Sequence, residues 1–106
     1  MIARLWHGVT TPENATKYEE LLRDEILPGI HRVEGYRGAY LLRREVSGGT
    51  EFITFTIFDS MDAVRRFAGD DFEAAVVPEE ARQLLTDFDR RSVHYTIVSE
   101  PRAVSG

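Results

Sequence analysis

The segment from residue 36 to residue 58 constrains the fold most strongly, because it reads as two strands joined by a tight turn. Residues 36–46 and residues 51–58 both alternate side-chain types with the two-residue period of a strand. The intervening residues 47–50 include Gly48 and Gly49, and glycine accepts the positive φ angles that a tight hairpin turn requires. The sequence therefore predicts an antiparallel hairpin in the middle of the chain.

The two sides of the 51–58 strand differ in composition, since its odd positions are all apolar and its even positions are mixed. A continuous apolar side is typical of packing against helices, so we expect the odd side to face helices. The residues expected there are Ile53, Phe55 and Ile57. We expect the even side to face a less apolar but still partly buried environment. The residues expected on that side are Phe52, Thr54, Thr56 and Phe58, with aromatic company from Trp6 or Tyr40.

The first third of the chain reads as a strand followed by a helix. Residues 2–9 alternate, and their parities place His7 with Ala3 and Leu5, which we expect to face the helices. Apolar residues then recur at helical spacing from residue 11 onward, and we expect Pro28 and Gly29 to end this helix.

The last third reads as helical segments followed by a strand. Residues 59–69 predict a helix with a cap at Asp59 and Ser60 and an end at Gly69. Residues 81–88 show helical spacing again, and residues 92–99 alternate as a final strand.

The resulting order is strand, helix, strand, strand, helix, strand. It predicts an α+β ferredoxin-like βαββαβ sandwich, in which a four-stranded antiparallel sheet carries its helices on one face. The other face would be left bare and aromatic, so we expect a homodimer that closes two sheets into a dimeric α+β barrel. Residues 1–100 form one domain in this prediction, and residues 101–106 form a flexible C-terminal tail.

Composition excludes several classes of protein and partner. The net charge of −5 argues against nucleic acid as a partner, and no apolar run approaches the 18 residues of a membrane span. The absence of cysteine excludes disulfides and thiolate chemistry. The three histidines, His7, His31 and His94, have no local ligand spacing, and no nucleotide or flavin fingerprint is present, so we expect neither a metal nor a cofactor. We expect a cytoplasmic protein.

Several segments of the sequence resemble one known family, and together they span about nine tenths of the chain. They are the opening Arg4-Leu5-Trp6-His7-Gly8, the stretch 35–44, the junction 58–63, the stretch 67–76 and the closing His94-Tyr95. The chain thereby resembles the antibiotic biosynthesis monooxygenase (ABM) domain family of dimeric α+β barrels. The resemblance implies the same fold, while the superfamily also holds haem-degrading enzymes and members without demonstrated activity.

The chain departs from this family pattern at two places. Members that oxidise polycyclic phenols or haem typically carry Trp where this chain has Phe58, and they often carry Asn on the first strand. Here the only asparagine is Asn14, in the first turn of the first helix. The resemblance therefore implies the shape of the family's pocket more strongly than it implies the same catalytic side chains in it.

Titratable and cationic side chains supply candidates for chemistry. Enzymes of this family are thought to deprotonate an electron-rich phenol or anthrone, whose carbanion then reduces O₂ without a cofactor. That reaction needs an apolar cavity, a proton acceptor and a cation, and our catalytic candidates are His7, His94 and Arg43, with Arg4 as a further cation. Our candidates for substrate binding are Trp6, His31, Tyr40, Phe58 and Tyr95.

Most of these candidates also have a structural interpretation. Trp6, Tyr40 and His94 suit packing in the core or at a dimer interface, His7 suits a hydrogen-bonded core histidine, His31 suits a surface loop, and Arg43 beside Arg44 suits a solvated strand end.

Two functional hypotheses follow. The leading one is a cofactor-independent monooxygenase acting on a small aromatic or polyketide-like molecule, in a small apolar pocket between sheet and helices. The alternative is a non-catalytic dimeric small-molecule-binding or stress-associated barrel protein, with haem binding as a third and weaker hypothesis.

Overall fold

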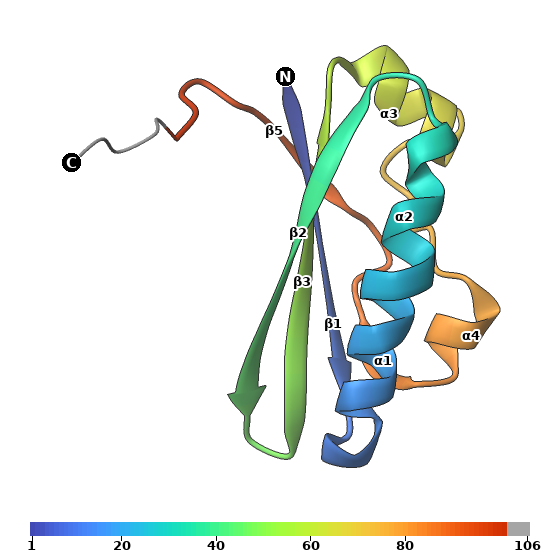
Figure 1. The fold of residues 1–106 in the computed structure, drawn as a ribbon, viewed down its shortest axis with the longest axis vertical. Coiled ribbons are helices and arrows are strands. Elements are labelled where there is room, and N and C mark those ends of the chain that lie inside the picture. The colour runs from blue at the N-terminus through green and yellow to red at the C-terminus, as the bar shows by residue number, and fades with distance from the viewer. Residues whose placement is uncertain (102–106) are drawn as a thin grey trace.

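The structure, a computed structural model that describes residues 1–101, is an antiparallel sheet covered by helices on one side (Figure 1). Within these residues the sheet has five strands in the order β2-β3-β1-β4, and β5 also pairs with β1. Residues 102–106 of the expected tail lie outside the described residues. The strands are β1 (Ile2–Thr10), β2 (Tyr36–Val46), β3 (Gly49–Phe58), β4 (Leu85–Phe88) and β5 (Val93–Thr96).

The predicted central hairpin is confirmed. β2 and β3 pair antiparallel from Tyr36 opposite Phe58 to Val46 opposite Gly49, and β3 pairs with β1 from Thr50 to Phe58. Gly48 sits in the connecting turn with a φ of 80°, the left-handed conformation that glycine adopts without strain. The ferredoxin-like α+β class predicted from the sequence is therefore the observed one, with an additional short strand.

One continuous helical run follows β1 and crosses the sheet. It comprises a 3-10 turn (Pro12–Asn14), α1 (Ala15–Leu21), a π-helical turn (Leu22–Ile26), α2 (Leu27–Gly29) and a second 3-10 turn (Ile30–Arg32).

The prediction that Pro28 and Gly29 end this helix is confirmed for its α-helical part, since α2 ends at Gly29. Pro28 follows the π-helical turn directly, and the 3-10 turn Ile30–Arg32 extends the helical run by three residues.

The second predicted helix is α3 (Met61–Ala68), and its predicted ends are confirmed. The Ser60 hydroxyl accepts a hydrogen bond from the Ala63 N–H, and Gly69 follows with a φ of 89°. The helix predicted over residues 81–88 is only partly present, because α4 spans Glu79–Arg82 and Leu85–Phe88 form β4. Residues 85–88 lie along the free edge of β1, and pairing with that edge overrides the local helical spacing.

The expected assignment of the two faces of β3 is wrong. Phe52 and Phe58 are fully buried on the helix side, together with Trp6 and Arg4 of β1. The apolar odd positions point to the side without helices, and His7 shares that side. Thr56 is tolerated on the helix side because its hydroxyl donates to the Arg4 carbonyl oxygen at 3.2 Å. The side without helices, which we call the open face, carries Leu5, His7, Tyr40, Leu42, Ile53, Phe55, Ile57, Val93 and Tyr95.

The core on the helix side divides into two clusters. One gathers Trp6, Tyr18 and Phe52 beneath α1, and the other gathers Phe58 and Val64 beneath α3. No helix among residues 1–101 combines the length and the apolar character needed to cross a bilayer.

Candidate functional site

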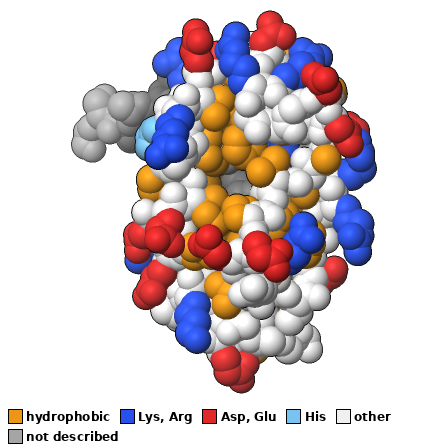
Figure 2. Space-filling view, turned by 90° about the vertical axis from the view of Figure 1, so that its right-hand side faces the viewer, with side chains coloured by type: hydrophobic (Ala, Val, Ile, Leu, Met, Phe, Trp, Pro, Cys, Tyr) orange, Lys and Arg blue, Asp and Glu red, His pale blue; other side chains and the backbone are white. Residues whose placement is uncertain are grey.

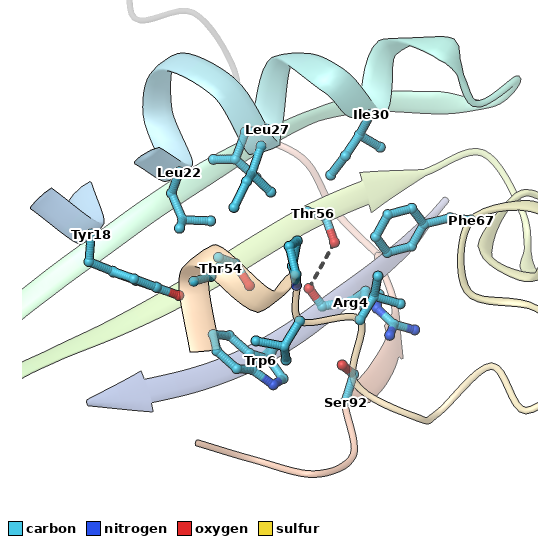
Figure 3. A pocket seen from close by; sticks show the side chains of 15 residues that line it. Arg4, Trp6, Tyr18, Leu22, Leu27, Ile30, Thr54, Thr56, Phe67 and Ser92 are labelled. Atoms are coloured by element: carbon cyan, nitrogen blue, oxygen red, sulfur yellow. Dashed lines mark hydrogen bonds between the residues drawn. The ribbon is translucent and has the colours of Figure 1, made fainter. Parts of the chain in front are cut away.

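A cavity of about 60 Å³, which we call the chamber, lies between the sheet and the helical run at the junction of the two core clusters. On the helix-covered side the surface is hollowed near its middle, and hydrophobic side chains gather around the hollow (Figure 2). The side chains in Figure 3 come from β1, β3, the helical run, α3, the segment before α4, α4 itself and the coil before β5. They are Arg4, Trp6, Tyr18, Leu22, Ile26, Leu27, Ile30, Thr54, Thr56, Phe67, Val76, Val77, Pro78, Ala81 and Ser92.

The chamber is small relative to an aromatic ring. An apolar protein cavity that accommodates benzene has a volume of roughly 150 Å³. An aromatic ligand therefore requires part of the lining to move. The irregular segment 70–78, which we call the strap, contributes Val76, Val77 and Pro78 to the wall, and Val76 is 46% exposed. The strap is the part of the lining with the least regular structure.

Arg4 is the charged group of the chamber. Arg4 is only 4% exposed, and burial lowers the pKa of its guanidinium to about 10. The guanidinium therefore remains charged at neutral pH. Nη1 donates to the carbonyl oxygen of Phe72, and Nη2 donates to that of Ala74 at 2.9 Å. The guanidinium carbon also lies 5.5 Å from the centre of the Phe67 ring, at a distance typical of a cation–π contact.

His94 lies opposite Arg4 in the β1–β5 ladder, and its Nε2 is 3.0 Å from Arg4 Nη1. Arg4 has only donors, so Nε2 accepts the hydrogen bond and the proton of the neutral ring is on Nδ1. Burial, and after it the charge of Arg4, lowers the pKa of His94 below its ordinary value of 6.5. His94 is therefore a neutral imidazole at physiological pH.

Hydroxyl groups supply the other polar atoms of the wall. Tyr18 is almost fully buried, and burial raises the pKa of its phenol, which stays protonated as a possible donor. Thr54 and Thr56 project from β3, and Ser92 lies in the coil that leads to β5. Ser92 Oγ is buried and has no hydrogen-bond partner among the described residues. In Figure 3, Tyr18 and Thr54 mark one end of the chamber, and Arg4 and Phe67 mark the other.

The structure places some predicted site residues at or beside the chamber. Trp6 lines it, with its indole Nε1 donating to the Asp89 carbonyl oxygen at 2.7 Å. His94 contacts the chamber through Arg4. Phe58 is fully buried in the second core cluster but is not part of the cavity wall.

The other predicted site residues lie elsewhere. His7 is on the open face, with Nε2 2.8 Å from a Glu51 carboxylate oxygen and Nδ1 3.5 Å from one of Asp89. Arg43 forms ion pairs with Glu19 and Glu45 at the surface.

Three further candidates are also away from the chamber. His31 is exposed in a separate open groove and contacts Tyr36 edge-on. Tyr40 and Tyr95 belong to the open face, where they are 58% and 57% exposed.

Sequence reasoning missed Tyr18, Thr54, Phe67 and Ser92 as wall residues, and it named Arg4 only as an available cation. Only Thr54 had a signal in the sequence, because Thr54 and Thr56 lie between Phe52 and Phe58 on the mixed side of β3. Within residues 1–101 no group of three or more His, Asp and Glu side chains is placed to hold a metal ion.

Comparison with known proteins gives one family and several similar folds. The family model described as antibiotic biosynthesis monooxygenase matches residues 2–77. No curated protein matches the chain.

Three of the similar solved structures span nearly the whole chain, and at these identities they show the fold alone. SnoaB, a cofactor-independent oxygenase from Streptomyces nogalater, is 18% identical with a TM-score of 0.66, covering 93% of this chain and 94% of its own. The ActVA-Orf6 monooxygenase of Streptomyces coelicolor, in complex with nanaomycin D, is 20% identical with a TM-score of 0.64 and coverages of 97% and 91%. The haem degrader MhuD of Mycobacterium tuberculosis is 16% identical with a TM-score of 0.63 and coverages of 96% and 100%.

Proposed function

Because the chain belongs to the antibiotic biosynthesis monooxygenase family, we propose that it is a cofactor-independent monooxygenase acting on a small aromatic or polyketide-like molecule in the chamber. The observation that carries this proposal is the chamber itself, a partly enclosed apolar cavity with a buried guanidinium in its wall. Solved structures of similar fold include an oxygenase and a monooxygenase of this kind, which supports the assignment of the reaction class.

The proposed reaction balances without an added reductant. A ring CH₂ group becomes a carbonyl, one atom of O₂ enters the product, and the other leaves as water. The electrons come from the substrate once it has lost a proton, and the positive charge of Arg4 favours this deprotonated form inside a low-dielectric cavity.

His94 is the base in this proposal. Its ring is neutral at physiological pH, and its Nε2 accepts a hydrogen bond from Arg4. When Arg4 Nη1 turns to the developing negative charge of the substrate, Nε2 becomes free to hold the proton. Arg4 and His94 thus act as a pair, and the roles predicted for His7 and Arg43 from the sequence stay predictions.

The test is oxygen consumption with hydroquinone and anthrone substrates. We expect uptake above the buffer rate for the wild type and a loss of at least tenfold for His94→Gln, as is usual for removal of a general base. His7→Gln is measured in parallel, and an equal loss there would place the base on the open face instead. An absence of uptake with every substrate would remove the enzyme proposal.

A non-catalytic binding protein is the second candidate, and the small volume of the chamber favours it. About 60 Å³ suits a ligand smaller than an aromatic ring, if the strap does not move. Ligand binding without oxygen uptake would support this alternative. Haem binding would need a Soret band on titration with haem.

We also propose that the protein is a homodimer joined through the open face. Tyr40, Leu42, Val93 and Tyr95 are each about half exposed there, and they adjoin the apolar row Ile53, Phe55 and Ile57. An apolar area of this extent is typical of a protein interface, and a second copy of the same face would cover it around a twofold axis. Light scattering coupled to size exclusion tests the proposal, since a mass near 12.1 kDa at high concentration would contradict it.

A further inference from the structure

The hydrogen bonds of Arg4 leave part of its guanidinium unused. A guanidinium carries five N–H donors. Nη1 is engaged by Phe72 and His94, and Nη2 is engaged once, by Ala74. The Nε–H and one Nη2–H therefore have no acceptor among residues 1–101.

The charge of Arg4 is also unmatched. Its acceptors are two carbonyl oxygens and a neutral imidazole, and no carboxylate of the described residues lies within 4 Å of it. By contrast, the surface arginines Arg23, Arg43 and Arg91 each pair with two carboxylates. A buried charge without a counter-charge is costly, so the arrangement favours an anion that enters the chamber.

Ser92 provides an independent observation at the same wall. The residue is 4% exposed, its Oγ has no partner among the described residues, and it lines the chamber together with Arg4. Its backbone is fixed, because the Ser92 N–H donates to the Glu73 carbonyl oxygen at 2.6 Å. Buried hydroxyls are nearly always hydrogen-bonded in folded proteins, so the Ser92 hydroxyl is free to donate a hydrogen bond to a ligand in the chamber.

We infer that the chamber binds a small aromatic acid that is already ionised when it enters, with its anionic oxygen group on Arg4 and Ser92. This inference rests on the proposed function, because it names the substrate class of the same chamber. A carboxylate fits the two open N–H donors as a bidentate partner, and a phenolate offers one oxygen to the same donors. The apolar body of the ligand extends along Trp6 toward Tyr18.

Arg4 also holds the strap, through the carbonyl oxygens of Phe72 and Ala74. These two hydrogen bonds use other N–H groups than the two open ones offered to the anion.

The experiment is an anaerobic titration followed by the fluorescence of Trp6, the only tryptophan of the sequence and a wall residue. The probes are benzoate with its neutral isostere benzamide, and 4-nitrophenolate as a representative phenolate. Propionate and propionamide are the smaller, non-aromatic acid and amide for comparison. We expect benzoate or 4-nitrophenolate to bind tenfold or more tightly than benzamide, and the comparison of these two anions separates a carboxylate from a phenolate.

Variants assign the contact. We expect Arg4→Met to weaken anion binding at least tenfold, Ser92→Ala to weaken it about threefold, and Arg44→Met, on the open face, to leave it unchanged. Because Arg4→Met also frees the strap, Arg4→Lys is the second variant: it keeps the charge, loses the planar fork and retains part of the affinity.

The inference is wrong if the amides bind as tightly as the acids, if neither aromatic anion binds, or if Arg4→Met and Ser92→Ala bind the aromatic anion as the wild type does. These outcomes are distinct from failure of the proposed function. Anion binding without oxygen uptake would leave the inference standing and remove the monooxygenase, whereas oxidation of neutral phenols with no anion binding would do the reverse.

Discussion

In most subunits the more apolar face of a sheet is the buried one, but in this subunit the more apolar face is the exposed one. The helix-covered face carries a guanidinium and two threonines among its aromatic residues, yet Phe52 and Phe58 on it are completely buried. The open face is almost continuously apolar in its central rows, yet Tyr40 and Tyr95 on it remain more than half exposed. The face with more polar groups is thus the one inside the subunit.

The difference follows from what each face contacts. The covered face forms one wall of a cavity. Polar side chains are stable there because Thr56 and Arg4 donate hydrogen bonds to backbone carbonyl oxygens. Nothing within residues 1–101 offers such acceptors above the open face, so its apolar residues suit a dry contact with a similar surface. A mixed strand face can therefore indicate a binding chamber, and a purely apolar one can indicate an interface.

Truncation of one phenylalanine on each face should give the largest contrast. We expect Phe58→Ala to lower the free energy of unfolding by about 3–5 kcal/mol, because it opens a cavity in a fully buried cluster. Phe55→Ala should cost about 1 kcal/mol in dilute protein, with a larger cost at high concentration as dimer stability is lost. Urea denaturation at two protein concentrations measures both, and equal costs at every concentration would contradict the comparison.

A charge on the open face should disrupt assembly without unfolding the subunit. We expect Phe55→Glu to weaken dimerisation about a hundredfold or more, because an unpaired carboxylate would be buried at the centre of the apolar face. Light scattering reports the mass, and circular dichroism confirms the fold. Thr16→Glu, exposed on α1, is the matched control and should dimerise as the wild type does.

Close packing on the covered face should penalise even one added methyl group. A Cβ at Gly8 would lie 2.8 Å from Trp6 Cη2 and 2.9 Å from Leu85 Cδ2, so we expect Gly8→Ala to destabilise by about 1–2 kcal/mol and to shift the Trp6 fluorescence. Gly29→Ala is the counterpart, since nothing lies within 4 Å and its φ of −63° is helical. It should leave both measurements close to those of the wild type, and matching losses would contradict the contrast.

The pH dependence of oxygen uptake should distinguish the histidines of the two faces, and it has the smallest expected effect. The base must be neutral, and the pKa of His94 is lowered by burial and by Arg4, so activity should fall only below a midpoint under 6.5. We expect this acidic limb to disappear in the residual activity of His94→Gln. A limb that moves instead with His7→Gln would contradict the role proposed for His94.

Much of the fold could be predicted because it depends on local patterns. Gly48 and Gly49 marked the hairpin, and Ser60 with Gly69 marked both ends of α3. Residues 85–88 could not be assigned locally, since Leu84, Leu85 and Phe88 have helical spacing and become a strand only beside the free edge of β1. Pro28 and Gly29 marked the end of the α-helical part of the first helical run, but not the 3-10 turn Ile30–Arg32 that continues it.

The candidate site could be predicted less well, because its residues come together only in the folded chain. Trp6, a candidate from the sequence, lies in the wall and His94 lies beside Arg4, whereas Tyr18 and Ser92 lie on a helix and in a coil far apart in sequence, with no motif of their own. The alternation of side chains along each strand predicted which residues share a face, but it did not predict which face the helices would cover.

The sequence by itself determined the strand alternation, the hairpin, the helix caps and the division of β3 into two unlike sides, because these depend on neighbouring residues along the chain. Only the tertiary structure decided which side became the interior and which groups meet at Arg4. The physical reason is that a helix packs where its own apolar stripe and the crossover geometry direct it, and both are properties of the folded chain rather than of any one strand.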